Sequence, residues 1–181
     1  MAQPEEPLPV KYFIAVLFPE AGKLMQVKKE LASRWGVIDF EGQDHPFDAT
    51  DYYQPEMGAP LYRKLLSFER LYTPALIVPM KLECNDIEAS FSRDGKRTVN
   101  LDAGYLDHNK FILASAKEAG QKVYLDRGIY ADLSGRYREG KYRPFEWSFP
   151  DFKDGRYDGE LLAIRNLYMQ QVKRYRSGDS N

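Results

Sequence analysis

The chain has 181 residues, of which 43% are hydrophobic and 29% are charged, and its formal net charge at pH 7 is −1. This length and composition predict a single globular domain that buries roughly 70% of the surface exposed by its unfolded chain. The near-neutral charge disfavours a dedicated nucleic-acid binder, and no apolar run approaches the ~18 residues of a membrane span. The only cysteine, Cys84, excludes an internal disulfide. We therefore expect a cytoplasmic protein in which Cys84 is a small buried side chain.

The first part of the chain predicts strands and helices in alternation. Residues 1–9 contain three prolines and two glutamates and are expected to be a flexible leader. We then expect a central strand at 10–18, a helix at 19–34 that stops at Gly36, a second strand at 37–40 and a helix that begins at Pro60. The helix after Pro60 is predicted from the spacing of Leu61, Leu65 and Phe68.

Residues 79–93 are also expected to be helical. Met80, Cys84, Ile87 and Phe91 form an apolar stripe at helical spacing. The alternative is a strand at 75–83, because three adjacent apolar residues occur there. The helix is favoured because the stripe persists to Phe91.

After residue 97 short strands predominate. Candidate strands lie at 98–102, 111–115, 123–125, 129–133 and 145–149, with turn signals at 103–104, 119–120 and 127–128. A last helix is expected at 158–175. The pattern predicts an α+β fold, with a mixed or antiparallel sheet that includes a meander in the C-terminal half and carries packed helices. The domain is expected to span residues 10–176, followed by a flexible tail at 177–181.

Residues 35–62 contain no lysine or arginine but carry six carboxylates. They are Asp39, Glu41, Asp44, Asp48, Asp51 and Glu56. Carboxylates this close in sequence repel one another unless cations offset them. The block therefore either covers a solvated loop or faces a positive partner.

The first candidate site joins part of this block to a later turn. Its carboxylates and amide are Asp48, Asp51, Glu56, Asn100 and Asp102, and its walls are Tyr52, Tyr53 and Tyr105. Oxygen ligands of this kind suit Mg²⁺, with Asp51, Glu56 and Asp102 as the ligands. A metal-free site for a small polar or phosphorylated ligand is a second interpretation, and local turn chemistry is a third. No spacing typical of a zinc site is present.

Several cations could complete this site. Arg63 and Lys117 belong to a basic set that also includes Lys64, Lys81 and Arg97. An arginine in a cleft can bind a phosphate or carboxylate through two hydrogen bonds, or it can neutralise Asp51 or Glu56. Structural ion pairing is the simpler role for Arg63. Neither His45 nor His108 has the partners of a catalytic triad, so no catalytic residue is assigned.

A different function is suggested by residues 136–143, which interleave four cations with two tyrosines. The last helix adds further cations, and aromatic side chains among cations are typical of single-stranded nucleic-acid binding. The alternative function is therefore an RNA- or protein-binding module. A homodimer, with the acidic block against the basic hairpin, would satisfy both surfaces.

Several phrases resemble a family known only as domain of unknown function number 4416, found in bacteria and archaea. They are Asp51-Tyr52-Tyr53-Gln54-Pro55-Glu56-Met57-Gly58, the expected helix at 63–69, and residues 100–106, 113–117 and 147–151. The chain departs from the family at Ala103, where proline is expected.

The resemblance implies no established activity. Members are sometimes described as GTP-binding, but this chain has no Gly-x-x-x-x-Gly-Lys-Ser/Thr loop to surround phosphates. Lys117 lacks the aspartate two residues later that would bind a guanine base. We therefore expect a ligand-binding protein that is not a P-loop GTPase.

Overall fold

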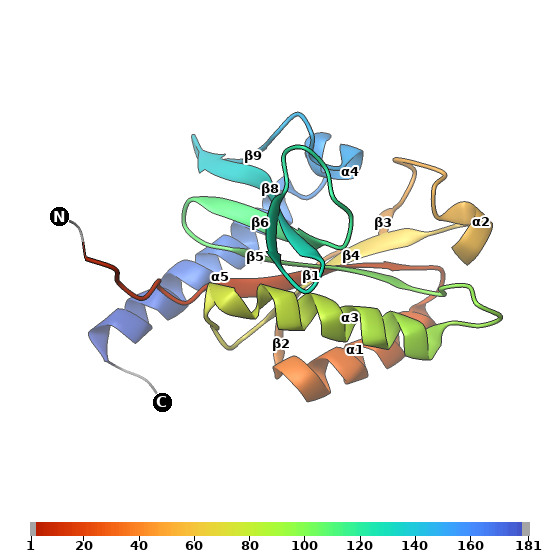
Figure 1. Cartoon of the computed structure of the whole chain (residues 1–181), viewed down its shortest axis with the longest axis horizontal. Coiled ribbons are helices and arrows are strands. Elements are labelled where there is room, and N and C mark those ends of the chain that lie inside the picture. The colour runs from red at the N-terminus through yellow and green to blue at the C-terminus, as the bar shows by residue number, and fades with distance from the viewer. Residues whose placement is uncertain (1–2, 179–181) are drawn as a thin grey trace.

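The computed structural model describes residues 3–178, and a single nine-stranded sheet runs through them (Figure 1). The order of the main strands is β2-β4-β1-β5-β6-β8-β7, with β3 paired to β4 and β9 paired to β8. All the strand pairs are antiparallel. The strands are β1 Lys11–Phe18, β2 Ile38–Glu41, β3 His45–Pro46, β4 Tyr62–Phe68, β5 Asn100–Leu106, β6 Lys110–Ser115, β7 Val123–Asp126, β8 Ile129–Arg138 and β9 Lys141–Pro144. The α+β class expected from the sequence is confirmed.

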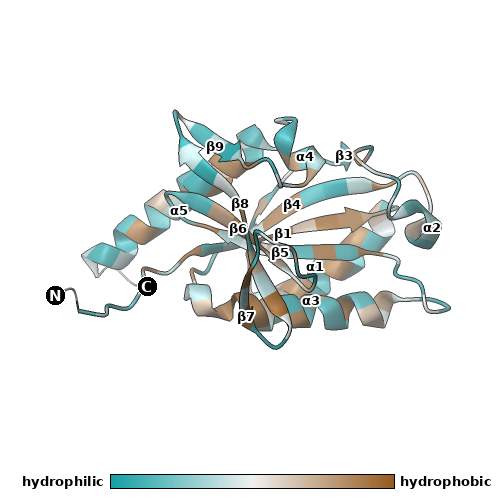
Figure 2. Cartoon of the chain, turned by 45° about the horizontal axis from the view of Figure 1, so that its top comes forward, coloured by the Kyte–Doolittle hydropathy of each residue, from teal (hydrophilic) through white to brown (hydrophobic). Residues whose placement is uncertain are grey.

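Helices cover both faces of this sheet. They are α1 Ala21–Trp35, α2 Gln54–Met57, the 3-10 turn η1 Pro74–Leu76, α3 Ile77–Phe91, α4 Pro150–Lys153 and α5 Asp158–Ser177. One apolar core packs α1 and α3 against one face, and a second packs α4 and α5 against the other. Figure 2 shows the resulting pattern, with apolar strands inside and polar loops and helix faces outside.

β1 lies in the interior of the sheet. All eight of its residues are buried, and it pairs with β4 on one side and β5 on the other. A strand covered on both faces needs apolar residues at nearly every position. The exception is Lys11, whose Nζ donates to Asp39 at 2.6 Å and to the carbonyl of Phe68 at 2.8 Å.

Most of the expected elements are confirmed. The strand at 10–18, the helix that stops at Gly36, the helix over 79–93 and the last helix all form. The backbone φ of Gly36 is +87°, a conformation that glycine adopts without strain. Cys84 is buried in α3, and burial raises the pKa of its thiol to about 12.

The helix predicted after Pro60 is wrong, because this segment is strand β4. Leu61, Leu65 and Phe68 fit helical spacing, but β4 is buried on both faces and therefore lacks the alternation that identifies a strand. The 63–69 segment, expected as a helix in the family resemblance, is corrected in the same way.

Two later expectations are also wrong. The turn at 103–104 does not form, because β5 continues through Gly104 to Leu106. The strand at 145–149 is replaced by a bend in which the amide of Ser148 donates to the carbonyl of Phe145, and the strand next to it is β9.

The expected leader and tail are only partly described, since residues 1–2 and 179–181 lie outside the described range. Within it, Leu8 packs against the core under α5. The last helix continues to Ser177, one residue past the expected end of the domain.

Candidate functional site

The sheet opens between β5 and β6. The two strands pair from Leu106–Phe111 to Gly104–Leu113. Beyond that point β5 continues beside β1 to Asn100, whereas β6 continues beside β8 to Ser115. The ends of β5 and β6 therefore diverge, and Gly104 lies at the apex of the opening.

Side chains from α3 take over the hydrogen bonds of β5 at this opening. The amide of Leu101 donates to Glu88 Oε1 at 2.6 Å, and its carbonyl accepts from Lys81 Nζ at 3.0 Å. Backbone groups at a strand edge need such partners when the neighbouring strand departs. Burial raises the pKa of Glu88, with Lys81 opposing the shift.

The opening is a cleft of about 540 Å³, a size typical of small-molecule sites. Four cations and three carboxylates line it, together with two asparagines and several aromatic rings. The lining residues used below are Tyr52, Tyr53, Lys81, Asn85, Glu88, Arg97, Asn100, Asp102, Ser115, Lys117, Lys122, Asp132 and Phe149.

Two polar atoms in this lining have no hydrogen-bond partner among residues 3–178. They are Nδ2 of Asn100 and Oδ1 of Asp132, and the two residues are only 4% and 5% exposed. Nearly all buried polar groups in proteins are hydrogen-bonded. A donor and an acceptor are therefore available to a molecule in the cleft.

Arg97 forms one corner of the cleft. Its Nε and Nη2 donate to the two carboxylate oxygens of Glu56, at 2.9 and 2.7 Å, and its Nη1 donates to Asn100 Oδ1 at 2.8 Å. The hydrogen bonds to Arg97 hold the pKa of Glu56 below its ordinary value. Asn100 is therefore fixed by its oxygen, which leaves the amide nitrogen free.

Lys122 forms the opposite corner. Its Nζ donates to Ser115 Oγ at 2.8 Å and lies 3.7 Å from Asp132 Oδ2. Burial raises the pKa of Asp132, and Lys122 opposes the shift. The free oxygen of Asp132 thus lies beside a cation that already contacts the other oxygen.

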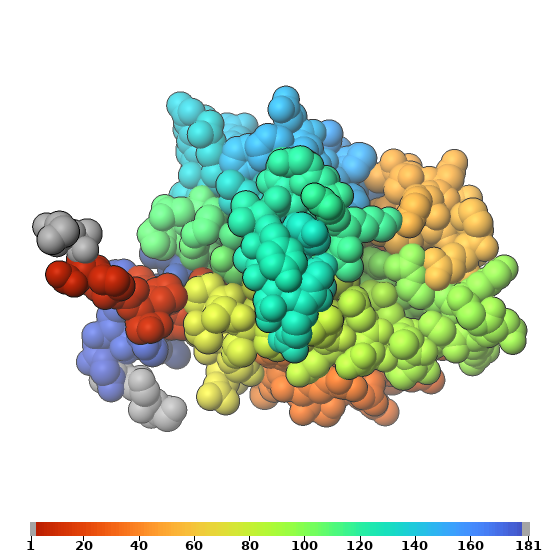
Figure 3. Space-filling model, viewed as in Figure 1, coloured from red at the N-terminus to blue at the C-terminus, as the bar shows by residue number. Residues whose placement is uncertain are grey.

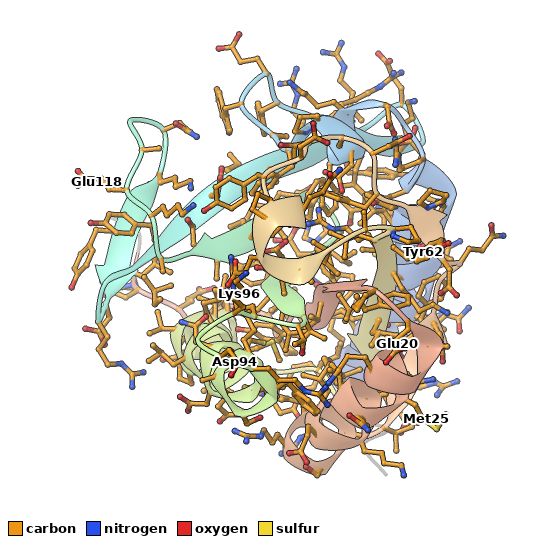
Figure 4. The ribbon with its side chains drawn as sticks, turned by 90° about the vertical axis from the view of Figure 1, so that its right-hand side faces the viewer. Glu20, Met25, Tyr62, Asp94, Lys96 and Glu118 are labelled. Atoms are coloured by element: carbon orange, nitrogen blue, oxygen red, sulfur yellow. The ribbon has the colours of Figure 1, made fainter. Side chains whose placement is uncertain are left out.

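Tyr52 and Lys117 meet at the mouth of the cleft. Lys117 Nζ donates to the hydroxyl of Tyr52 at 2.8 Å and lies 4.5 Å from the centre of its ring. This contact joins the loop before α2 to the segment between β6 and β7, which crosses the front of the molecule in Figure 3. Figure 4 views this end, where the β6–β7 segment, marked by Glu118, stands apart from the loop with Asp94 and Lys96.

Arg63 lies behind the cleft. It is fully buried on β4, where Nη2 donates to Asp102 at 3.0 Å and Nη1 to Asp151 at 2.6 Å. The ring of Phe47 covers its guanidinium at 4.6 Å, and the hydroxyl of Tyr157 donates to Asp151 at 2.9 Å. Arg63 therefore neutralises Asp102 and Asp151. It does not neutralise Asp51 or Glu56, the two partners that the sequence suggests.

Of the ten residues predicted from the sequence, five line the cleft. They are Tyr52, Tyr53, Asn100, Asp102 and Lys117. Glu56 and Arg63 each hold a lining residue from behind, through Arg97 and Asp102 respectively. For all seven of these residues, a role in ligand binding stays a prediction.

The other three predicted residues lie elsewhere. Asp48 pairs with Arg156 at 2.8 Å, and Asp51 is an exposed acceptor for the side chain of Gln54. Tyr105 lines separate cavities near η1 and β7 or the N-terminal segment. Asp102 lies within β5, so local turn chemistry does not explain this residue.

The acidic block is dispersed by the fold. Asp39, Glu41, Asp44, Asp48 and Glu56 each pair with a lysine or arginine from outside the block. No group of three or more His, Cys, Asp or Glu side chains that could hold a metal occurs within residues 3–178. Asp51, Glu56 and Asp102, considered as Mg²⁺ ligands, therefore do not form a common set.

The sequence did not single out Asn85, Glu88, Lys122, Asp132 or Phe149. Only Asp132 could have been noticed in the sequence, because it is a charged residue that follows three uncharged residues of a predicted strand.

In the basic hairpin, residues 136–143, Arg138 and Arg143 both contact Glu139, and Arg165 lies 3.6 Å from the centre of the Tyr137 ring. These contacts leave nucleic-acid binding a prediction.

Comparison with known proteins gives a family. A model described as "Domain of unknown function (DUF4416)" matches residues 8–168. The chain belongs to this family. The match extends from just before β1 to the middle of α5, so the cleft lies wholly within the DUF4416 region. No curated protein and no solved structure matches the chain. Within residues 3–178, no helix has the length and apolar character needed to cross a membrane.

Proposed function

We propose that this protein binds a small polar ligand, phosphorylated or otherwise anionic, in the cleft between β5 and β6. The observation that carries the proposal is the pair of buried, unpartnered atoms in its lining, Asn100 Nδ2 and Asp132 Oδ1. An unsatisfied buried polar group costs about 1–3 kcal/mol, so a ligand that completes one gains binding free energy. Buried atoms of Trp35, Arg63, Asp151 and Glu160 also lack a partner among the described residues, but none of these residues lines the cleft.

Lys117 supports an anionic ligand. It is exposed, and its contacts are with the ring and hydroxyl of Tyr52, neither of which carries a full charge. By contrast, Arg97 is already bound to Glu56 and Asn100. Lys117 is thus the lining cation that can turn toward an anion at the smallest cost. The proposal concerns binding and includes no reaction.

The test is a thermal-shift screen with inorganic phosphate, carboxylic acids, amino acids, sugars, sugar phosphates and nucleotides. A ligand at a hundred times its Kd should stabilise the fold by about 2.7 kcal/mol. Asn100→Asp keeps the oxygen that contacts Arg97 but removes the free amide donor, and it should weaken binding by roughly tenfold. The control is Asn166→Asp, the same change on the exposed face of α5.

Two outcomes would contradict the proposal. One is a screen in which no class of compound raises the unfolding temperature. The other is a stabilising ligand whose affinity is the same in Asn100→Asp, Asn166→Asp and the unmodified protein.

A further inference from the structure

The surroundings of Asp132 restrict what the ligand can donate to it. Asp132 Oδ1 is free, while Oδ2 lies 3.7 Å from the Lys122 ammonium. A ligand ammonium at Oδ1 would lie close to that lysine, and like charges at such separations repel. The position therefore suits a neutral donor.

A hydroxyl fits this corner better than an amide N–H. A hydroxyl donates one hydrogen bond and accepts others, whereas an N–H only donates. Here the ligand atom faces an acceptor, Asp132 Oδ1, beside a donor, Lys122 Nζ, whose nearest partners are Ser115 Oγ and the carbonyl of Lys117. One ligand hydroxyl can satisfy both groups.

The rest of the lining also suits a ligand that carries hydroxyl groups. Asn100 offers a free amide donor, and Asn85 adds a second amide side chain to the wall. Aromatic rings of Tyr52 and Phe149 also line the cleft, and these residues are 58% and 38% exposed. Amides and a carboxylate bind hydroxyls, while exposed rings cover the apolar C–H groups between those hydroxyls.

We propose that the ligand is a polyhydroxylated molecule, a sugar or polyol that carries one anionic group, and that Asp132 accepts a hydrogen bond from one of its hydroxyls. Lys117 holds the anionic group at the mouth. This inference rests on the proposed function and narrows it to one class of ligand. It makes Asp132 the residue that determines specificity.

The experiment uses two pairs of probes that differ only in their hydroxyls or ring. D-gluconate is compared with n-hexanoate, and glucose 6-phosphate with n-hexyl phosphate, by calorimetric titration of the full chain. A hydrogen bond to a charged group should make the hydroxylated member of at least one pair bind about tenfold or more tightly. Asp132→Asn removes the charge that strengthens this hydrogen bond and should lower that ratio several-fold. The control, Asp86→Asn on the exposed face of α3, should leave it unchanged.

The outcomes separate this inference from the proposed function. Equal binding within both pairs, or a ratio unchanged in Asp132→Asn, overturns the inference but leaves the cleft as a ligand site if Asn100→Asp weakens binding. Tight binding of another class of compound, with no binding of the hydroxylated probes, also overturns the inference and leaves the cleft as a ligand site. Failure of every compound in the screen overturns both. If Asp132→Asn does not fold, the ratio in the unmodified protein decides the ligand class.

Discussion

Two groups of buried polar side chains lie on either side of Asp102, and they differ in what they face: one group joins elements of the fold, and the other lines the cleft. On one side Arg63 bonds to both Asp102 and Asp151, and Phe47 and Tyr157 contact this cluster. Arg63 Nε and Asp151 Oδ1 also lack a partner among the described residues, but neither residue lines the cleft. On the other side, in the cleft, Asn100 and Asp132 retain atoms with no partner in the part of the chain that the structure describes.

The difference separates charges that hold the fold from polar groups that face a ligand. The arginine cluster links β4, β5 and α4, so its ion pairs join elements far apart in sequence. The free atoms of the cleft join nothing. Removing a charged group from the arginine cluster should therefore lower the free energy of unfolding strongly. Removing a polar group from the cleft should weaken ligand binding more than it lowers the free energy of unfolding.

The strongest test of this contrast is Arg63→Met. Removing one partner of a buried ion pair leaves the other charged in a low-dielectric site, which costs about 3–5 kcal/mol of unfolding free energy. Here two carboxylates, Asp102 and Asp151, lose their common cation. Urea denaturation measures the effect, and Arg143→Met on exposed β9 should change stability by no more than about 0.5 kcal/mol.

The cleft supplies the second half of this test. Asp132→Asn should change the unfolding free energy by about 1 kcal/mol or less, since Oδ1 has no bond to lose, Oδ2 lies as far as 3.7 Å from Lys122 Nζ, and Lys122 keeps its hydrogen bond to Ser115. If Arg63→Met costs no more than Asp132→Asn, the proposed division between the two sides of Asp102 does not exist.

A smaller effect is expected at the apex of the cleft. A Cβ added to Gly104 would lie 2.4 Å from the carbonyl oxygen of Ile112 and 2.8 Å from Leu113 Cδ2. The first neighbour is backbone, so β5 and β6 must separate at the point where their pairing ends. Gly104→Ala should cost about 1–3 kcal/mol by overpacking.

Gly22→Ala is the matched control for this substitution. Gly22 lies in α1, and an added Cβ there meets nothing within 4 Å. Alanine favours a helix, so the control should be neutral or stabilising by up to about 1 kcal/mol. Equal destabilisation by the two substitutions would mean that contact with Ile112 is not the cause.

The sequence predicted the elements whose pattern is local. The helix that stops at Gly36 and the last helix have clear apolar stripes, and turn signals separate β6 from β7 and β7 from β8. β4 was mistaken for a helix because burial on both faces removes strand alternation. Its spacing of apolar residues then fitted a helix by chance.

The cleft was predictable only in part for a related reason. The polar and aromatic residues near Tyr52 and Asn100 stand out in sequence, and the fold brings them together. Asp132 enters the cleft because β5 and β6 stop pairing at Gly104, and the point at which two strands diverge depends on the packing of the whole sheet. No local pattern marks that point.

The smallest predicted effect concerns Glu56, which supports the cleft from outside through Arg97. The hydrogen bonds from Arg97 lower its pKa from the ordinary 4.5, so the folded state favours the ionised carboxylate. A lowered carboxyl pKa gives stability that is fully present above the unfolded value and is lost as the pH falls through the folded value. The side chains of Glu56 and Arg97 are 30% and 28% exposed. This ion pair should therefore contribute no more than about 1 kcal/mol to the free energy of unfolding at pH 7.

Glu56→Gln measures this contribution through urea denaturation at a series of pH values. The stability difference between the unmodified protein and the variant should be largest near pH 7 and should shrink as the pH falls below 4.5. Glu30→Gln, an exposed glutamate on α1, should show a smaller difference at pH 7. A difference for Glu56→Gln that stays constant down to pH 3 would show that the carboxylate charge does not hold Arg97. Asn100 would then owe its orientation to packing and not to the Glu56–Arg97 pair.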